Sequence, residues 1–515
     1  MTAFSRLDSV LHALTRSPGP GGAVAVLKDG AVLARQTWGW ADMERRLPFT
    51  PETLFRICSI TKQFTCATLL DQFPDPSVLN PDLAAHLPHL TGQRPTVRDL
   101  AHNQSGLRDY WATAMLCGAP AEGVFGPTDA QALIARTASL HFAPGAHYSY
   151  CNQNFRLLGD LVANRTGHSL AALLRRRLFD PAGMPNAQLC PETAALPDGT
   201  VGYEGSLTDG WRAAVNRLHW TGDAGIAASL NDMIAWEQAI DAVRDDPDSL
   251  YARLSAPTQF ADGTQASYGF GLSRMTLHGR LAIGHGGGLR GWRSLRFYAP
   301  ADRISVVVLF NHMADPRPVA MDLFGALLDL PTPTLPAAPD PAWQGTYLDP
   351  ATGLVARLDL TPDHRLVLWF GQGPETLTIA ANGDAVSGNL TLRRTATGIT
   401  MRRGNENFSA SLIPCTGDAP RDLDGVFHNP EYGATFTCTT AGGALYGAFS
   451  GFLGQGMMQV LLPVGPDVWR LPMPRALDFA PPGDWSLTFA RDAHGRVAGV
   501  TVGCWLARGV AFRKV

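Results

Sequence analysis

The chain has 515 residues, which at roughly one domain per 150 residues predicts three to four domains with sizeable cores. Its 42 Lys and Arg residues nearly balance 45 Asp and Glu residues, and charged residues make up 17% of the chain. This balance excludes the basic surface of a nucleic-acid-binding protein and the composition of a disordered chain. We therefore expect a globular protein with no nucleic-acid partner.

The N-terminal segment MTAFSRLDSVLHALTRS carries Arg6, Asp8 and Arg16 among its apolar residues and has no small-residue cleavage site. It does not match a secretory signal. The eight cysteines are scattered without a C-x-x-C pair, a pattern typical of reduced thiols. Residues 448–465 are uncharged, but their glycines, glutamines and proline make a poor membrane helix. We therefore expect a cytoplasmic protein with no membrane span.

Strand-like and helical patterns alternate along the first 330 residues. The strand-like runs are 23–27, 54–58 and 304–310, and the clearest helical patterns are 59–73 and 153–165. This mixture predicts one α+β domain over residues 1–330.

The first chemical motif is Ser59-Ile60-Thr61-Lys62, at the junction of a strand-like run and a helix. A spacing of three places Ser59 and Lys62 on one helical face, where the amine can reach the hydroxyl. A free lysine has a pKa of about 10.4, so a basic lysine at neutral pH needs burial or a neighbouring cation to lower that pKa. An isolated Ser-x-x-Lys is usually solvated helix surface, so the motif needs further support.

Two later motifs supply that support. Tyr150-Cys151-Asn152 lies in a loop that runs into an amphipathic helix, and His285-Gly286-Gly287-Gly288 lies between strand-like runs. The histidines show no metal-ligand spacing, since only His86 and His89 are close and a proline separates them. We therefore expect no metal and no cofactor.

The proline-rich segment PTPTLPAAPDP, residues 331–341, predicts an extended linker. After it, short alternating runs with glycine turns predict an all-β region. GTYLDPATG (345–353) and GVFHNPEYG (425–433) share Gly, Pro and Gly in register, and Gly-Gln-Gly follows each at 371–373 and 454–456. These matches predict two copies of one unit, at 342–416 and 417–515, each an antiparallel β-barrel because closure removes exposed sheet edges.

The second copy carries about a dozen extra residues, a length at which loops in compact domains are usually functional. On the sequence alone a plain surface insertion is an equal alternative. The segment is defined by Pro474, Arg475, Ala476, Leu477, Asp478, Phe479, Ala480, Pro481, Pro482, Gly483 and Asp484.

The motif series Ser-x-x-Lys, Tyr-x-Asn and His-x-Gly resembles that of the serine penicillin-recognising enzymes, which include class C β-lactamases, D-alanyl-D-alanine carboxypeptidases and related esterases. Supporting words are TLFRICSITKQFT (53–65), HNQSGLRDY (102–110), RLFDPAGMPNA (177–187) and TGDAGIAASLNDMIAW (221–236). The whole chain resembles the D-stereospecific aminopeptidase family, which joins such a domain to two antiparallel β-barrels. In that family a loop of the last barrel enters the active site.

The resemblance implies that Ser59 is the acylated nucleophile and that Lys62 is its general base. It also implies that Tyr150 passes a proton to the leaving amine, that Asn152 holds a substrate amide, and that His285 stands beside the site.

The resemblance further implies that the backbone N–H groups of Ser59 and Gly288 form the oxyanion hole. Each such donor contributes about 3 to 4 kcal/mol to transition-state stabilisation. Attack by the serine gives an acyl-enzyme, which water then cleaves.

Two residues bear on the substrate. His285 replaces the lysine that binds a substrate carboxylate in the carboxypeptidases, and a histidine is neutral for much of the time near pH 7. Asp478 in the extra loop is an acid that can bind a free α-amino group, and Ala480, Pro481 and Pro482 can exclude long N-terminal extensions. These features favour an aminopeptidase acting on small peptides, amides or esters with an N-terminal D-residue, whereas D-selectivity itself rests on the resemblance.

Two alternatives remain open. One is a D,D-carboxypeptidase or esterase with the same site, and the other is a penicillin-binding sensor without turnover whose barrels hold an apolar ligand. The resemblance also implies a homodimer and inhibition by β-lactams.

Overall fold

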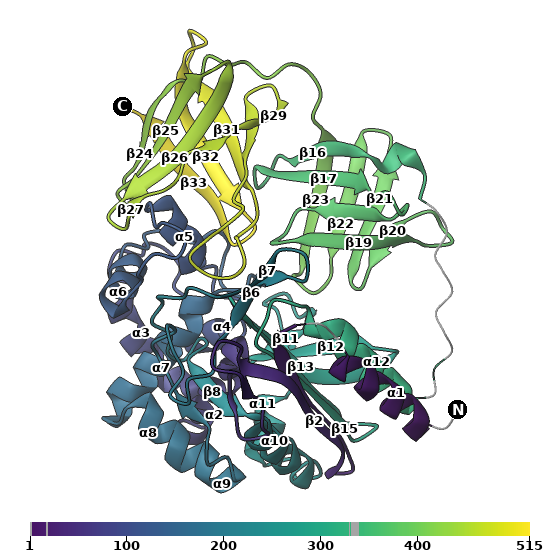
Figure 1. Ribbon diagram of the computed structural model, residues 1–515. Helices are drawn as coiled ribbons and strands as arrows, with labels where there is room; N and C mark the ends of the chain where they lie inside the picture. Colours follow the sequence, from purple (N-terminus) through teal and green to yellow (C-terminus); the bar gives the residue numbers. More distant parts are fainter. Residues whose placement is uncertain (1–2, 17–18, 329, 331–338) are drawn as a thin grey trace.

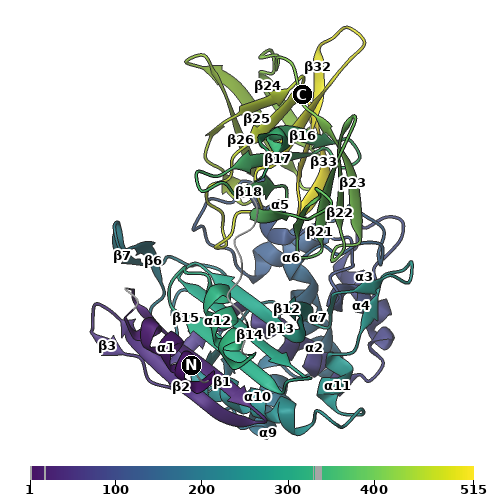
Figure 2. The ribbon, with the colours of Figure 1, turned by 90° about the vertical axis from the view of Figure 1, so that its right-hand side faces the viewer.

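The computed structural model describes residues 3–16, 19–328, 330 and 339–515, which form one α+β body and two β bodies (Figure 1). Both β bodies lie at the same end of the α+β body, as the view turned by 90° also shows (Figure 2). Residues 331–338 of the expected linker lie outside the described residues. The domain limits 1–330, 342–416 and 417–515 stay a prediction.

An eight-stranded sheet forms the centre of the α+β body, in the order β11-β12-β13-β14-β15-β1-β2-β3. In chain order these strands are β1 (Gly21–Lys28), β2 (Ala31–Asp42), β3 (Leu47–Pro48), β11 (Tyr268–Gly269), β12 (Leu272–Leu277), β13 (Arg280–Leu289), β14 (Trp292–Ala299) and β15 (Ile304–Phe310). A three-stranded sheet, β4-β8-β5, and a hairpin, β6-β7, complete the region around the nucleophile. Their bounds are β4 (Leu54–Arg56), β5 (Gln188–Leu189), β6 (Tyr203–Ser206), β7 (Gly210–Ala213) and β8 (Ile226–Ser229).

Apolar cores cover both faces of the large sheet. Along β1, Val24 and Val26 face a core beneath the terminal helices α1 (Ala3–Thr15) and α12 (Pro316–Leu328). Ala23 and Ala25 face the larger core, because side chains alternate along a strand. Burial on both faces explains why residues 23–27 and 304–310 read as continuous apolar runs.

The larger core is formed mainly by helices. They are α2 (Thr61–Gln72), α3 (Asn80–His86), α4 (Val97–Ala101), α5 (Tyr110–Leu116), α6 (Pro127–Ala135), α7 (Asn152–Thr166), α8 (Leu170–Leu174), α9 (Asp180–Ala182), α10 (Leu230–Ala242) and α11 (Leu250–Leu254). The expected helix over 59–73 begins instead with a 3-10 turn at Cys58–Ile60, and α2 follows it. The expected helix over 153–165 is α7, which ends where Gly167 adopts a left-handed conformation (φ 68°).

The first β body is a closed barrel of eight strands, named here the closed barrel. Its strands are β16 (Gly345–Asp349), β17 (Leu354–Leu360), β18 (Leu366–Trp369), β19 (Pro374–Ile379), β20 (Ala385–Ser387), β21 (Leu390–Thr395), β22 (Gly398–Arg403) and β23 (Phe408–Pro414). Alternating apolar side chains such as Leu358, Leu368 and Leu392 are buried inside it. The predicted barrel is confirmed for this copy.

The second β body is a ten-stranded sheet, named here the half-barrel. Its strands are β24 (Gly425–Asn429), β25 (Ala434–Ala441), β26 (Ala444–Gly451), β27 (Gly454–Gln455), β28 (Gln459–Val460), β29 (Leu462–Gly465), β30 (Val468–Leu471), β31 (Trp485–Arg491), β32 (Val497–Cys504) and β33 (Ala507–Lys514). The strand path runs from β27 to β29, and off this path β28, which lies just before β29 in the chain, pairs with β26. The sheet thus curls into a half-barrel, and the expected arrangement of two barrel-like β bodies after the α+β body is confirmed.

The sequence repeat has a structural reason. Tyr347 and Phe427 are matching buried residues of β16 and β24. Asp349 ends β16 and accepts a hydrogen bond from the Ala351 N–H, as Asn429 ends β24 and accepts one from the Tyr432 N–H. The sequence pattern shared by residues 345–353 and 425–433 therefore specifies the first turn of each β body.

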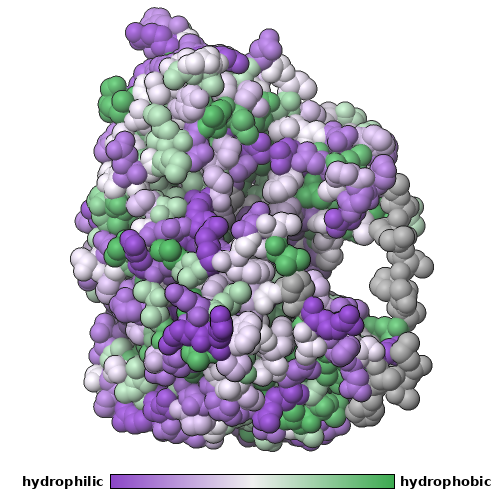
Figure 3. Space-filling model, in the orientation of Figure 1, coloured by the Kyte–Doolittle hydropathy of each residue, from purple (hydrophilic) through white to green (hydrophobic). Residues whose placement is uncertain are grey.

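No helix in the described part of the chain is both long enough and apolar enough to cross a membrane. On the face that Figure 3 shows, polar and apolar residues are interspersed.

The half-barrel contacts the end of α5 through backbone atoms. The Leu453 N–H donates to the Cys117 carbonyl at 3.1 Å. Gly118 has a left-handed φ of 81°, and a Cβ atom there would lie 2.1 Å from the Gly454 carbonyl oxygen. Glycine is thus required for this approach between the two bodies.

We predict that Gly118→Ala destabilises the protein more than Gly92→Ala. Gly92 shares the positive φ, at 79°, but no atom lies near its missing Cβ. Both substitutions carry the left-handed penalty of roughly 1 to 2 kcal/mol, and overpacking at Gly118 adds about 1 to 3 kcal/mol. Calorimetric unfolding of the two variants measures the difference, and equal effects would contradict the backbone contact.

Candidate active site

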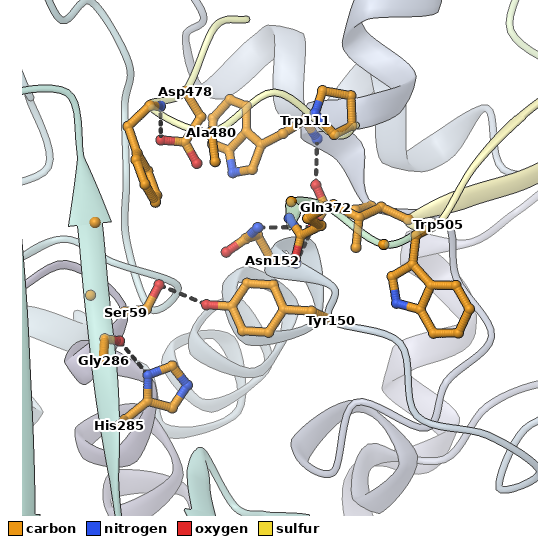
Figure 4. Close-up of a pocket in the computed structure, with 18 of the residues that line it drawn as sticks. Ser59, Trp111, Tyr150, Asn152, His285, Gly286, Gln372, Asp478, Ala480 and Trp505 are labelled. Atoms are coloured by element: carbon orange, nitrogen blue, oxygen red, sulfur yellow. Dashed lines mark hydrogen bonds between the residues drawn. The ribbon is translucent and has the colours of Figure 1, made fainter. Parts of the chain in front are cut away.

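The predicted nucleophile lies on the tight turn before α2. Cys58 adopts a left-handed conformation (φ 51°), and this turn leads from β4 to Ser59. The Ser59 Oγ accepts hydrogen bonds from the Lys62 Nζ at 3.0 Å and from the Tyr150 hydroxyl at 2.7 Å (Figure 4 draws the second). The spacing argument for Ser59 and Lys62 thus agrees with the geometry.

Lys62 is completely buried. Besides Ser59, its Nζ donates to Asn152 Oδ1 at 2.9 Å and to the Asp223 carbonyl at 2.8 Å. Burial lowers the pKa of Lys62 to about 8, while the charges of Asp223 and Asp109 oppose that shift. The sequence suggested burial or a neighbouring cation as the cause, and the structure gives burial among acidic neighbours.

Tyr150 stays protonated, because burial raises the pKa of its phenol well above the ordinary value. Its hydroxyl therefore acts as a donor to Ser59. The ring also lies against Lys62, whose Nζ is 4.8 Å from the ring centroid. With Lys62 protonated, the Ser59 Oγ thus accepts two hydrogen bonds, and its own hydroxyl hydrogen points elsewhere.

Asn152 is the first residue of α7 and links Lys62 to a buried carboxylate. Its backbone N–H and its Nδ2 donate to Asp109 Oδ2 at 2.6 and 2.9 Å. Its Oδ1 accepts from Lys62. In the structure Asn152 therefore forms a hydrogen bond with Lys62.

His285 lies on β13 and is buried. Its Nδ1 is 2.5 Å from the Gly286 carbonyl, which can only accept, so Nδ1 carries the proton. Its Nε2, 3.1 Å from the Tyr268 hydroxyl, is then an acceptor. Burial and the nearby Lys62 lower the pKa of His285 to about 3. His285 is therefore neutral and bonds to Tyr268 instead of to Ser59.

The glycines of β13 allow two close approaches. At Gly287 a Cβ atom would lie 2.4 Å from the Ile57 carbonyl oxygen, on the turn that carries Ser59. At Gly288 a Cβ atom would lie 2.4 Å from the ring of Phe479. Glycine thus lets β13 touch both the nucleophile turn and the loop of the half-barrel.

A cavity of about 620 Å³ opens over Ser59 and has walls from all three bodies. The α+β body contributes Ser59, Tyr150 and Asn152, the closed barrel contributes Gln372, and the half-barrel contributes Trp505 (Figure 4). From the predicted loop, the residues that line the cavity are Ala476, Asp478, Phe479, Ala480 and Pro482.

Arginines anchor the first half of the loop. Arg290 donates to the carbonyl oxygens of Ala476 and Asp478 at 2.7 and 3.1 Å. Arg475 forms ion pairs with Glu122 and, at 2.9 Å, with Glu204.

The other loop residues support the chain instead of facing the cavity. Leu477 is buried, and Asp484 pairs with Arg470 at 2.8 Å. Gly483 packs against the closed barrel, where a Cβ atom would lie 2.9 Å from the Gly371 carbonyl. Pro474 and Pro481 are not part of the cavity wall, so Ala480 and Pro482 alone represent the expected steric barrier there.

Asp478 lies across the cavity from Gly286 and His285 (Figure 4). Its carboxylate accepts the Phe479 N–H at 2.5 Å. Burial and the charge of Asp109 raise the pKa of Asp478 to about 7, against the opposing effect of Arg290 and Lys62. A cationic group bound beside it would favour the ionised form.

Four residues of the site were not predicted from the sequence. Asp109 and Asp223 lie in the words HNQSGLRDY and TGDAGIAASLNDMIAW, so a signal existed, whereas Trp505 had none. Gln372 belongs to the repeated Gly-Gln-Gly, whose contact with the cavity only the tertiary fold determines.

Comparison with known proteins identifies the family. A family model described as Beta-lactamase matches residues 10–329, and one described as D-aminopeptidase, domain B, matches residues 336–513. A D-aminopeptidase of Brucella ovis is 49% identical over 512 residues, which cover 99% of this chain and 98% of that protein. The chain belongs to the D-aminopeptidase family. Another member, a D-aminopeptidase of Gluconobacter oxydans, is 50% identical over 521 residues, covering 99% of each chain.

Solved structures share the fold of this D-aminopeptidase family member. An octameric penicillin-binding protein homologue from Pyrococcus abyssi has a TM-score of 0.53 and 20% identity, covering 86% of this chain and 95% of that chain. A D-amino acid amidase from Ochrobactrum anthropi SV3, complexed with L-phenylalanine, has a TM-score of 0.52 and 19% identity, covering 63% and 99%. At these identities the likeness concerns the fold alone.

We predict that Lys62→Met slows acylation of Ser59 by p-nitrophenyl acetate by about 10² to 10⁴-fold, the usual contribution of a general base. In the wild type this rate should rise with pH through about 8, because Lys62 must lose its proton to act as a base. The p-nitrophenol burst measures both effects, and the ester has no amine that could titrate.

Lys514→Met is the matched control, since Lys514 lies on the exposed end of β33. It should leave the burst unchanged. A wild-type rate that is the same on both sides of the Lys62 pKa would contradict the assignment.

Proposed function

We propose that this protein is a serine hydrolase that releases N-terminal D-amino acids, such as D-alanine, from small peptides, amides or esters. The observation that carries the proposal is one cavity lined by Ser59, Tyr150 and Asp478, in which the Ser59 Oγ accepts hydrogen bonds from Tyr150 and from the buried Lys62 behind it. Ser59, Lys62 and Tyr150 form an acylating site, and Asp478 suits a substrate with a free amine.

The acylation chemistry follows from the hydrogen bonds at Ser59. Neutral Lys62 takes the Ser59 proton while Oγ attacks the substrate carbonyl. Backbone N–H groups of Ser59 and Gly288 stabilise the oxyanion.

The leaving nitrogen takes a proton from the Tyr150 hydroxyl. Tyr150 recovers it from Lys62, since both groups bond to the same Ser59 oxygen. Water then attacks the acyl-enzyme by the same proton path in reverse, which releases the amino acid and restores Ser59.

The N-terminal end of the substrate is proposed to lie at the half-barrel loop. An ionised Asp478 binds the α-ammonium group, and Ala480 and Pro482 leave little room beyond it. The D-configuration is supported by the relatives named D-aminopeptidase from Brucella and Gluconobacter.

In a D,D-carboxypeptidase a cation holds the substrate carboxylate; the neutral His285 does not provide one, and the cations of this cavity are instead Arg293, Arg317 and Arg403. The esterase and sensor alternatives have no specific observation in their favour. The cytoplasmic location, the homodimer and inhibition by β-lactams stay predictions.

We predict that wild-type enzyme releases p-nitroaniline from D-alanine p-nitroanilide and discriminates against the N-acetylated analogue. Asp478→Asn should lower kcat/KM for the free-amine substrate by about 10 to 100-fold, the usual contribution of a hydrogen bond to a charged group. The value of kcat/KM for the N-acetylated analogue should fall much less, because that substrate has no ammonium group.

Asp467→Asn is the matched control in the same half-barrel, where Asp467 pairs with Arg491 at 2.9 Å. It should leave both substrates unaffected. If Asp478→Asn lowered kcat/KM equally for both substrates, Asp478 would be excluded as the ligand of the substrate amine.

A further inference from the structure

Asp109 is a buried carboxylate that lies just before α5 and has no role in the chemistry described above. Its Oδ1 caps α5 by accepting the Trp111 N–H at 2.8 Å. Its Oδ2 accepts both N–H donors of Asn152, the backbone N–H and the Nδ2. One carboxylate therefore joins the start of α5 to the start of α7.

This contact determines which end of the Asn152 amide faces Lys62. An ionised carboxylate only accepts hydrogen bonds, so the NH₂ end of the amide must face Asp109. The oxygen end then faces the Lys62 Nζ, where the distance is 2.9 Å. With the amide reversed, two donors would face each other at Lys62.

The half-barrel in turn holds Asp109. The Asp109 N–H donates to the Leu506 carbonyl at 3.0 Å, and the neighbouring Arg108 Nε donates to the Arg508 carbonyl at 2.9 Å. Leu506 lies in the turn between β32 and β33. A second segment of the half-barrel, separate from the loop of Asp478, therefore reaches the catalytic groups.

We propose that Asp109 is a positioning residue for acylation, which orients the Asn152 amide toward Lys62 and is itself placed by the β32–β33 turn. This proposal rests on the proposed serine hydrolase function and deepens it. It makes the half-barrel part of the acylating machinery as well as the substrate wall.

The charges around Asp109 give the proposal a pH signature. The carboxylates that act on Lys62 are Asp109, Asp223 and Asp478, and Lys62 in turn acts on Asp109. The neutral phenols, thiols and imidazole nearby are those of Tyr110, Tyr150, Cys58, Cys66, Cys151, Cys504 and His285. Burial raises the pKa of Asp109 to about 6, so it is ionised where Lys62 titrates. Its negative charge raises the pKa of Lys62. Loss of that charge should move the acid limb of the rate profile to lower pH.

Asp109→Ser separates the two functions of the side chain. Serine is a strong N-cap and can still accept the Trp111 N–H, but it is too short to reach Asn152. Asp109→Asn keeps the size and removes the charge. In both variants the burst with p-nitrophenyl acetate and kcat/KM for D-alanine p-nitroanilide should fall at least about tenfold, since a hydrogen bond to a charged group is lost. The acid limb of the burst profile should also shift to lower pH.

Asp129→Ser is the matched control, because Asp129 is also a helix-capping carboxylate and accepts the Gly126 N–H at 2.8 Å at the start of α6. Its rates and pH profile should match the wild type. An Asp109→Ser enzyme with wild-type rates would overturn the proposal, as would slow rates with an unshifted pH profile.

A loss confined to the p-nitroanilide would make Asp109 a ligand of the substrate amine and would also overturn the proposal. The ester burst requires only Ser59 and its proton path. A wild type that shows the burst but does not cleave the p-nitroanilide would therefore contradict the aminopeptidase function without affecting the test of Asp109.

Discussion

The burial of the Lys62 amine is the constraint on which the rest of the site depends. An amine without water needs other acceptors, and Lys62 has three: Ser59 Oγ, Asn152 Oδ1 and the Asp223 carbonyl. Burial favours the neutral amine and the acidic neighbours favour the charged one, and the balance lies at a pKa of about 8. A small change in the burial of Lys62 or in the negative charge around it therefore changes the fraction of the amine that is neutral near pH 7.

The three bodies contribute to this balance in different ways. The α+β body supplies the nucleophile turn, and β13 approaches it closely because Gly287 has no side chain. The half-barrel inserts two segments, the loop with Asp478 and the β32–β33 turn that holds Asp109. The closed barrel supports the loop where Gly371 meets Gly483. The α+β body thus supplies the reacting groups, and all three bodies supply the residues that surround and position them.

Local patterns in the sequence predicted the elements and the first contacts of the site. A spacing of three was sufficient for the pair of Ser59 and Lys62, and apolar runs were sufficient for β1 and β15. Contacts between distant segments had no such signal: nothing local connects Asp109 to Leu506, and nothing local indicates that His285 bonds to Tyr268. The curvature of the half-barrel likewise had no local signal, because it depends on β28 pairing with β26 while β29 pairs with β30.

The most direct test of the account is the mass of the acyl-enzyme trapped by rapid acid quench after mixing with D-alanine or L-alanine methyl ester. We expect the D-ester to add one alanyl group to the peptide that contains Ser59, the L-ester to add little, and Ser59→Ala to remain unlabelled. Equal labelling by both esters would contradict the proposed stereochemistry. Labelling at another residue would contradict the role of Ser59 itself.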